Sequence, residues 1–125
     1  LVCSDRCGGW KPYAEALGAR FVRWDITTGG LLEALGMESV DLCIVSCVMN
    51  YISTREVMDE FASLLNEEKV TAMIVSERDT PLAAAKLIES RGVHVRRLID
   101  QLLGRDDRQT IWMSQGMAEG LREVA

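Results

Sequence analysis

Short apolar runs alternate along the chain with segments whose apolar residues recur at helical spacing. The apolar runs, which predict β-strands, lie at 1–4, 19–26, 40–46, 70–76, 93–99 and 109–114. The run at 40–46, VDLCIVS, is typical of a strand that is buried on both faces of a parallel sheet, so we expect it to be the central strand. The last two runs are separated by the polar loop GRDDR, which is typical of an antiparallel pair at the end of a sheet.

The strongest helical pattern follows Ser53, which forms a capping box with Glu56. Apolar residues then repeat at i, i+1, i+4, i+7 and i+8, at Val57, Met58, Phe61, Leu64 and Leu65. Further helices are predicted at 12–17, 27–36, 81–91 and 115–125, with Thr80 as a cap before Pro81 and with Gly18 and Gly92 as stops.

Strands that alternate with helices of this length imply right-handed βαβ crossovers. We therefore predict an α/β fold with a doubly wound, mostly parallel sheet and an antiparallel terminal strand. A chain of 125 residues that is 48% hydrophobic can bury the core of one compact domain, which we place at 1–125. Ligands of such sheets bind at the carboxyl ends of the strands, so the residues that follow each strand are the candidate site.

The overall charge argues against a polyanionic partner. The formal net charge is −5, so the chain has no broad basic surface to hold a nucleic-acid backbone. Eleven arginines leave room for a local basic patch, and binding to nucleic acid is therefore disfavoured by charge but stays open.

Cysteine usage indicates a reduced compartment. The cysteines stand at positions 3, 7, 43 and 47, two of them inside an apolar run, which favours an intracellular, cytoplasmic protein. Their three-residue spacing differs from the two-residue spacing typical of zinc sites, and we expect no metal. The sequence shows no signal peptide and no apolar stretch of the roughly 20 residues that a membrane helix needs. Because the chain opens on Leu1 in a strand-like run, we expect it to be part of a longer chain.

The order of elements and the strand-loop DLCIVSCVMNYI at 41–52 resemble the S-adenosylmethionine-dependent methyltransferases, which have a Rossmann-like fold. The similarity runs from that family's fourth strand to its seventh. It implies that the chain binds S-adenosylmethionine and transfers the methyl group to an acceptor that the sequence does not identify.

The N-terminal segment SDRCGGW can be aligned with this family in two ways. In the first, Gly8 and Gly9 form the cofactor loop, as the Gly-Gly-Trp of the FtsJ-type RNA 2′-O-methyltransferases does, and Asp25 binds the cofactor ribose. In the second, Asp5 ends the second strand and takes the ribose role, while Asp25 and Ile26 flank the adenine. The first strand and its glycine loop would then lie upstream of Leu1. Both alignments place Asp25 beside the cofactor.

The catalytic tetrad of the FtsJ-type enzymes, Lys-Asp-Lys-Glu, does not match this chain. The three positions that can be compared read Ser46-Cys47, Ser76-Glu77-Arg78 and Thr110. Deprotonation of a ribose hydroxyl needs a lysine with a lowered pKa, and none is supplied here. We therefore disfavour FtsJ-type catalysis.

The strongest candidates for the methyl-transfer region follow the predicted central strand. Ser46 and Cys47 would contact the cofactor, and Asn50 and Tyr51 would position the acceptor, because methyl transfer from a sulfonium depends mainly on positioning. We expect Cys47 itself to be a buried structural thiol, not a nucleophile. Each candidate also has a purely structural interpretation. The residues after the central strand could simply pack in a loop, the two aspartates could cap strand ends, and Gly8 and Gly9 could form an ordinary turn.

Two other classes of function stay open. The chain could be a catalytically degenerate methyltransferase-like module that serves as a structural or protein-binding part of a larger assembly, which the missing tetrad favours. A nucleotide-binding oxidoreductase domain would instead need the motif Gly-x-Gly-x-x-Gly, which the sequence lacks.

Overall fold

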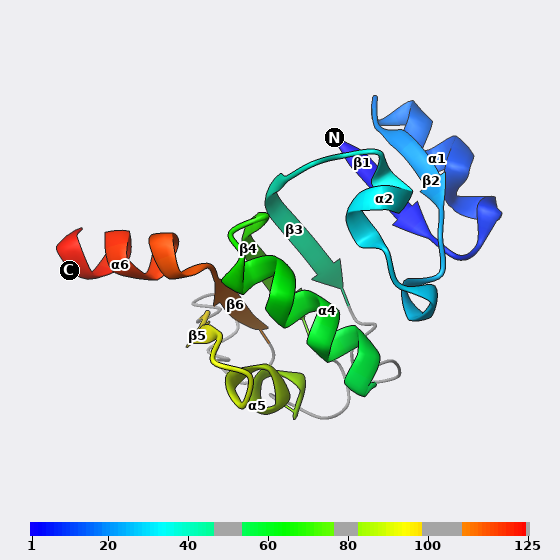
Figure 1. Cartoon of the computed structure of the whole chain (residues 1–125). Coiled ribbons are helices and arrows are strands. Elements are labelled where there is room, and N and C mark those ends of the chain that lie inside the picture. The colour runs from blue at the N-terminus through cyan, green and yellow to red at the C-terminus, as the bar shows by residue number, and fades with distance from the viewer. Residues whose placement is uncertain (47–53, 77–82, 99–108, 125) are drawn as a thin grey trace. The chain divides into compact units, whose positions relative to one another are not determined.

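The computed structural model describes residues 1–46, 54–76, 83–98 and 109–124 (Figure 1). These residues form two compact units, Leu1–Glu38 and Ser39–Ala125. Each unit has its own small sheet, and each is described separately below.

The first unit contains a βαβ arrangement. Strands β1 (Val2–Asp5) and β2 (Arg20–Arg23) are parallel, in a register that pairs Val2 with Arg20 and Asp5 with Arg23. The connection between them passes through the 3₁₀ turn η1 (Gly8–Trp10) and helix α1 (Lys11–Ala16), which packs against β2. This is the strand-helix-strand order expected from the apolar pattern, since two parallel strands need such a crossover.

A second helix completes the first unit. After β2 the chain makes the 3₁₀ turn η2 (Ile26–Thr28) and enters α2 (Leu31–Leu35), whose three leucines are buried. Gly29 and Gly30 between them have φ values of 76° and 75°, which favour glycine, so this pair lets the chain reverse into the helix. The Arg20 guanidinium donates to the backbone carbonyl of Leu35 and thereby ties β2 to the end of α2.

The second unit is built on a four-stranded mixed sheet. Its strands are β3 (Val40–Ser46), β4 (Val70–Ser76), β5 (His94–Arg97) and β6 (Gln109–Met113), in the order β3-β4-β6-β5. β3 and β4 are parallel, whereas β6 runs antiparallel to both β4 and β5. The antiparallel pairing of the last two predicted strands is therefore confirmed.

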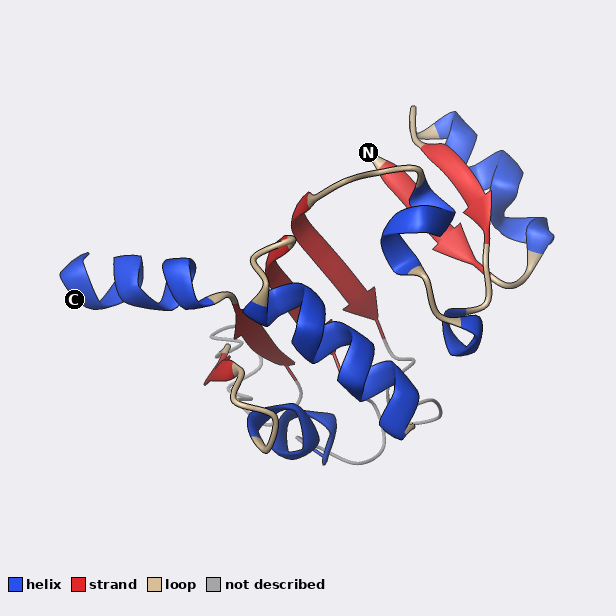
Figure 2. Ribbon diagram, in the orientation of Figure 1, coloured by secondary structure: helices blue, strands red, loops and turns tan. Residues whose placement is uncertain are grey.

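Three helices accompany this sheet: α4 (Arg55–Asn66), α5 (Ala83–Glu89) and α6 (Gln115–Val124) (Figure 2). The predicted apolar face of α4 is its buried face, with Met58 and Leu65 fully inaccessible to solvent. Phe61 on this face meets Trp112 of β6 edge-on, with ring centroids 6.4 Å apart. Burial of this amphipathic stripe holds α4 on the sheet.

The start of α4 differs by one residue from the prediction. Thr54 is the N-cap, and its hydroxyl accepts a hydrogen bond from the backbone N–H of Val57 at 3.3 Å. The predicted box placed this role on Ser53, which lies outside the described residues. Both are hydroxyl residues with the same capping chemistry, so the pattern indicated a cap here but not which hydroxyl supplies it. The predicted cap and first turn of the next helix, Thr80 and Pro81, also lie outside the described residues.

Two further sequence expectations are corrected by the sheets. We expected one doubly wound sheet, but the described strands form a pair and a separate four-stranded sheet. We also expected 40–46 to be a central strand buried on both faces, yet β3 is an edge strand of its sheet. Leu42 and Ile44 on one of its faces are 51% and 68% exposed, while Val45 on the other face is buried. An apolar run shows that a strand is suited to burial, but its neighbours decide how much is buried.

Candidate functional site

The first candidate carboxylate, Asp5, is the last residue of β1. Its Oδ1 accepts a hydrogen bond from the backbone N–H of Cys7 at 2.7 Å, which turns the chain toward η1. The backbone N–H of Trp24 donates to the carbonyl of Asp5 at 3.0 Å, so the hydrogen bonding between the two strands continues one residue past the end of β2. The expected strand-end position of Asp5 is confirmed, and one of its carboxylate oxygens already organises the turn.

Gly8 and Gly9 follow in the exposed turn η1. Neither glycine has a positive φ. A Cβ at Gly8 would come no closer than 3.8 Å to Arg23, and one at Gly9 would lie 3.5 Å from the Cys7 sulfur, which are ordinary contacts. The described residues therefore give no steric reason for glycine at either position. The pair forms a turn, and its use as a cofactor loop stays a prediction.

The second carboxylate, Asp25, lies two residues beyond the end of β2 and caps η2. Its Oδ1 accepts hydrogen bonds from the Thr27 hydroxyl at 2.7 Å and from the Thr27 backbone N–H at 2.9 Å. These two bonds, the hydroxyl first, lower the pKa of Asp25 below that of an ordinary aspartate, and the Arg6 charge adds a smaller effect. Asp25 is therefore held as a carboxylate at neutral pH. Ile26, the other predicted adenine contact, is half-buried at the start of η2.

The fold of the first unit brings these groups to one edge of its sheet. β1 and β2 are parallel, so their carboxyl ends meet at the same edge, where Asp5 pairs with Arg23 and Asp25 follows two residues later. The Arg23 Nε donates to the backbone carbonyl of Arg6 at 3.0 Å and fixes the turn beside β2. This edge therefore presents two carboxylates next to an exposed glycine turn. Carboxylate oxygens of this kind accept hydrogen bonds from sugar hydroxyls.

In the second unit, Ser46 is the last residue of β3 and is exposed. It pairs in register with Ser76, the last residue of β4, so two hydroxyls mark the carboxyl edge of the parallel strands. The other predicted residues of this region, Cys47, Asn50 and Tyr51, lie outside the described residues. Three residues earlier in β3, burial raises the pKa of the Cys43 thiol, which keeps it protonated and unreactive.

In the described parts of the chain, no group of three or more His, Cys, Asp or Glu side chains could hold a metal ion. No helix among the same residues is long and apolar enough to cross a membrane.

No family model, curated protein or solved structure matches this chain.

Two features of the candidate site were not predicted from the sequence. Thr27 donates to Asp25 from its hydroxyl and its backbone N–H, although the helical pattern predicts it only as the start of a helix; Asp-x-Thr is a local capping pattern that indicates this contact. Arg6 is far from Asp25 in the sequence, and the parallel pairing of β1 with β2 brings the two residues near each other.

Proposed function

We propose that this chain is part of an S-adenosylmethionine-dependent methyltransferase that acts on an acceptor not yet identified. The strand arrangement is the observation that carries the proposal. The chain has parallel strands with carboxylates at the carboxyl ends of β1 and β2, and the last described strand, β6, runs antiparallel to its neighbours. The resemblance noted in the sequence implies these features.

The separation of the two sheets fits one of the two alignments. In a doubly wound sheet with the strand order 3-2-1-4-5-6, the first strand separates the pair 3-2 from the strands 4-5. The described sheets supply these two groups if β1 and β2 are the second and third strands and β3 and β4 are the fourth and fifth. This supports the alignment in which Asp5 takes the ribose role and residues before Leu1 provide the first strand and its glycine loop.

The two carboxylates are suited to different parts of the cofactor. Asp5 ends a strand, and its Oδ2 accepts no hydrogen bond from the described residues, so this oxygen can accept one from a ribose hydroxyl. Asp25 is held by Thr27 through Oδ1 in the same way and likewise keeps Oδ2 for a ligand. In this alignment Asp25 and Ile26 flank the adenine.

The chemistry needs little acid or base assistance from the protein. S-Adenosylmethionine would supply a methyl group activated by its sulfonium, and the leaving group would be the neutral thioether S-adenosylhomocysteine. Positioning dominates such a transfer, and we assign it to Asn50 and Tyr51, with Ser46 and Cys47 toward the cofactor.

Calorimetry with S-adenosylmethionine and S-adenosylhomocysteine on the intact protein tests this proposal. We expect saturable binding that is about tenfold weaker in an Asp25→Asn variant, which keeps the acceptor atom for Thr27 but loses the charge. Asp41→Asn is the matched control, because Asp41 is an exposed aspartate of β3. Absence of heat with millimolar ligand would rule out the cofactor, and equal affinity of the Asp25 variant and the parent would refute the role of that residue.

One observation favours a second candidate, a non-catalytic module within a larger assembly. The exposed Leu42 and Ile44 give β3 an apolar face that a partner or another part of the protein could cover. If the intact protein bound neither cofactor form but eluted as a stable complex with other subunits, this candidate would replace the enzyme.

A further inference from the structure

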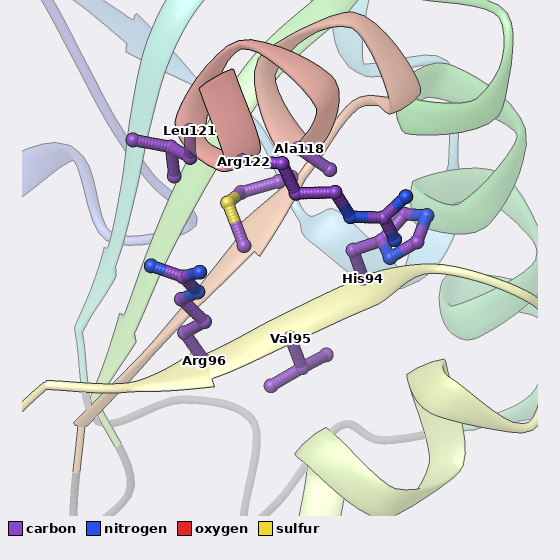
Figure 3. A pocket seen from close by; sticks show the side chains of 7 residues that line it. His94, Val95, Arg96, Ala118, Leu121 and Arg122 are labelled. Carbon is purple, nitrogen blue, oxygen red and sulfur yellow. The ribbon is translucent and has the colours of Figure 1, made fainter. Parts of the chain in front are cut away.

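We propose that the second unit holds a separate binding site for a small phosphorylated ligand, in a cavity between β5 and α6 (Figure 3). The cavity has a volume of about 160 Å³. Its lining includes His94 and Arg96 of β5 and Arg122 of α6.

Strand β5 supplies two of the three basic side chains, because alternate side chains of a strand lie on the same face of the sheet. His94 and Arg96 are two residues apart on β5, so their side chains project from the same face of the sheet. Figure 3 shows both on the side of β5 that faces α6, with Val95 directed away. Among the described strands, β5 pairs only with β6 and is therefore at the edge of its sheet.

The helix supplies the third group. Ala118, Leu121 and Arg122 are spaced at i, i+3 and i+4 and therefore lie on one face of α6, and all three line the cavity. Ala118 is buried at the base of this face, and the Arg122 side chain extends from the helix toward β5 (Figure 3). Ser114 fixes the start of α6, since its hydroxyl accepts from the backbone N–H of Met117 at 3.3 Å.

A chain of hydrogen bonds orients His94. Its Nε2 lies 2.9 Å from Oε1 of Gln115, and the amide nitrogen of Gln115 donates to Oε1 of Glu119 at 2.8 Å. Because the amide nitrogen is committed to Glu119, Gln115 presents its oxygen to the imidazole, and the His94 Nε2 must donate. The ring is thereby held from the first turn of α6, with Nδ1 as its remaining polar atom.

The cavity concentrates positive charge in a chain with a net charge of −5. Among the residues that the structure describes, no carboxylate lines it and neither Arg96 nor Arg122 forms an ion pair. Glu119, one helical turn before Arg122, accepts a hydrogen bond from Gln115. Two guanidinium groups that line one small cavity match the charge of a phosphoryl group and offer it N–H donors.

The location separates this cavity from the proposed methyl-transfer region. His94 pairs with Met113, and Met113 pairs with Ala72 near the start of β4, whereas Ser46 and Ser76 mark the opposite, carboxyl edge of the sheet. The volume suits one compact phosphate group better than a polynucleotide, which the net charge also disfavours. We therefore assign the cavity to a phosphate monoester.

The test is a ¹H–¹⁵N NMR titration of the intact protein with inorganic phosphate and with glycerol phosphate at neutral pH. We expect saturable shifts confined to His94–Arg97 and Gln115–Val124. Arg96→Gln and Arg122→Gln should each weaken binding about tenfold. Arg55→Gln on α4 removes the same charge from an exposed arginine and should change nothing. The pocket arginines are both exposed, so the rest of the spectrum should stay intact.

Any of four outcomes would overturn the assignment. Acetate at matched ionic strength could cause the same shifts, the Arg55 control could weaken binding as much as the pocket variants, or the shifts could spread over the whole chain without saturating. Tighter binding of a single-stranded oligonucleotide than of glycerol phosphate would point to a phosphodiester backbone and also overturn it. Binding of S-adenosylmethionine, measured separately, reports on the proposed function alone.

Discussion

Thr110 has a structural role at a position where the FtsJ-type comparison would place a catalytic residue. It stands at the position of the tetrad glutamate in the FtsJ-type comparison, yet its side chain is 1% exposed and faces the core. Its hydroxyl accepts the indole N–H of Trp112, which is fully buried, at 3.0 Å. Thr110 therefore supplies the hydrogen-bond acceptor that the buried indole N–H of Trp112 needs.

Replacing Thr110 with valine keeps the shape of the side chain but removes this acceptor. We expect the free energy of unfolding to fall by about 1–3 kcal/mol, because the indole N–H is left buried without a partner. Urea denaturation measures the change. Thr71→Val, at an exposed position of β4, is the control and should have little effect. Equal losses in the two variants would show that the hydrogen bond contributes nothing.

Asp25 provides a prediction about pH. Its pKa is lowered in the folded protein, mainly by the Thr27 hydroxyl, so the carboxylate stabilises η2 at neutral pH. That contribution is fully present above the unfolded value of about 3.9 and is lost as the pH falls through the lower, folded value. A Thr27→Val variant should therefore raise the pKa of Asp25 toward an ordinary aspartate. NMR titration of the Asp25 carboxyl carbon measures this pKa, and an unchanged value would show that the Thr27 hydroxyl is not its main cause, because the Thr27 backbone N–H remains in the variant.

At the scale of elements, local patterns predicted most strands and helices, because hydrophobic periodicity and helix caps depend only on residues that are close in the sequence. The run at 70–76 became β4, and the apolar stripe after Ser53 became the buried face of α4. The edge position of β3 was not predictable in this way, since it depends on which strands pair with it across long sequence distances. In the same way, alternation could place His94 and Arg96 on one face, but only the docking of α6 adds Arg122.

The two faces of β3 should respond differently to substitution. Ile44 is 68% exposed, so Ile44→Thr should change the free energy of unfolding by less than about 0.5 kcal/mol. Val45 is buried, and Val45→Ala should cost about 2 kcal/mol through lost apolar burial and a small cavity. Denaturation of the two variants measures this contrast. A large loss for Ile44→Thr would mean that its face is covered in solution.

The cap of α4 gives a third stability test. Thr54 accepts the backbone N–H of Val57, one of the N–H groups that an α-helix leaves unpaired at its start. Thr54→Ala should lower the free energy of unfolding by about 1 kcal/mol, whereas Thr54→Ser should keep most of it. Thermal denaturation of the two variants measures the loss of stability and distinguishes the capping hydrogen bond from other effects of replacing Thr54. A serine variant as unstable as the alanine variant would show that the hydroxyl is not the stabilising group.

At the scale of the whole molecule, the two units differ in how well their strands are supported. β4 has a paired strand on each side, and four of its side chains are 3% exposed or less: Val70, Ala72, Met73 and Val75. β1 and β2 pair only with each other among the described strands, and neither contains a buried residue. A two-stranded sheet is marginal unless other elements cover it.

We therefore expect amide hydrogen exchange to be slowest in β4 and clearly faster in β1 and β2, since local opening of a poorly buried pair requires less free energy than opening a central strand. Exchange measured by NMR on residues 1–125 tests this directly. Repeating it on a polypeptide extended upstream of Leu1 adds a second comparison. If a first strand pairs with β1 and β3, as the proposed function requires, their amides should become protected while those of β5, at the far edge of the sheet, stay unchanged. If the amides of β1 and β2 exchanged as slowly as those of β4 in residues 1–125, the expected difference between the two units would be contradicted. If the amides of β1 and β3 gained no protection in the extended polypeptide, the proposal that an upstream strand lies between them would be contradicted.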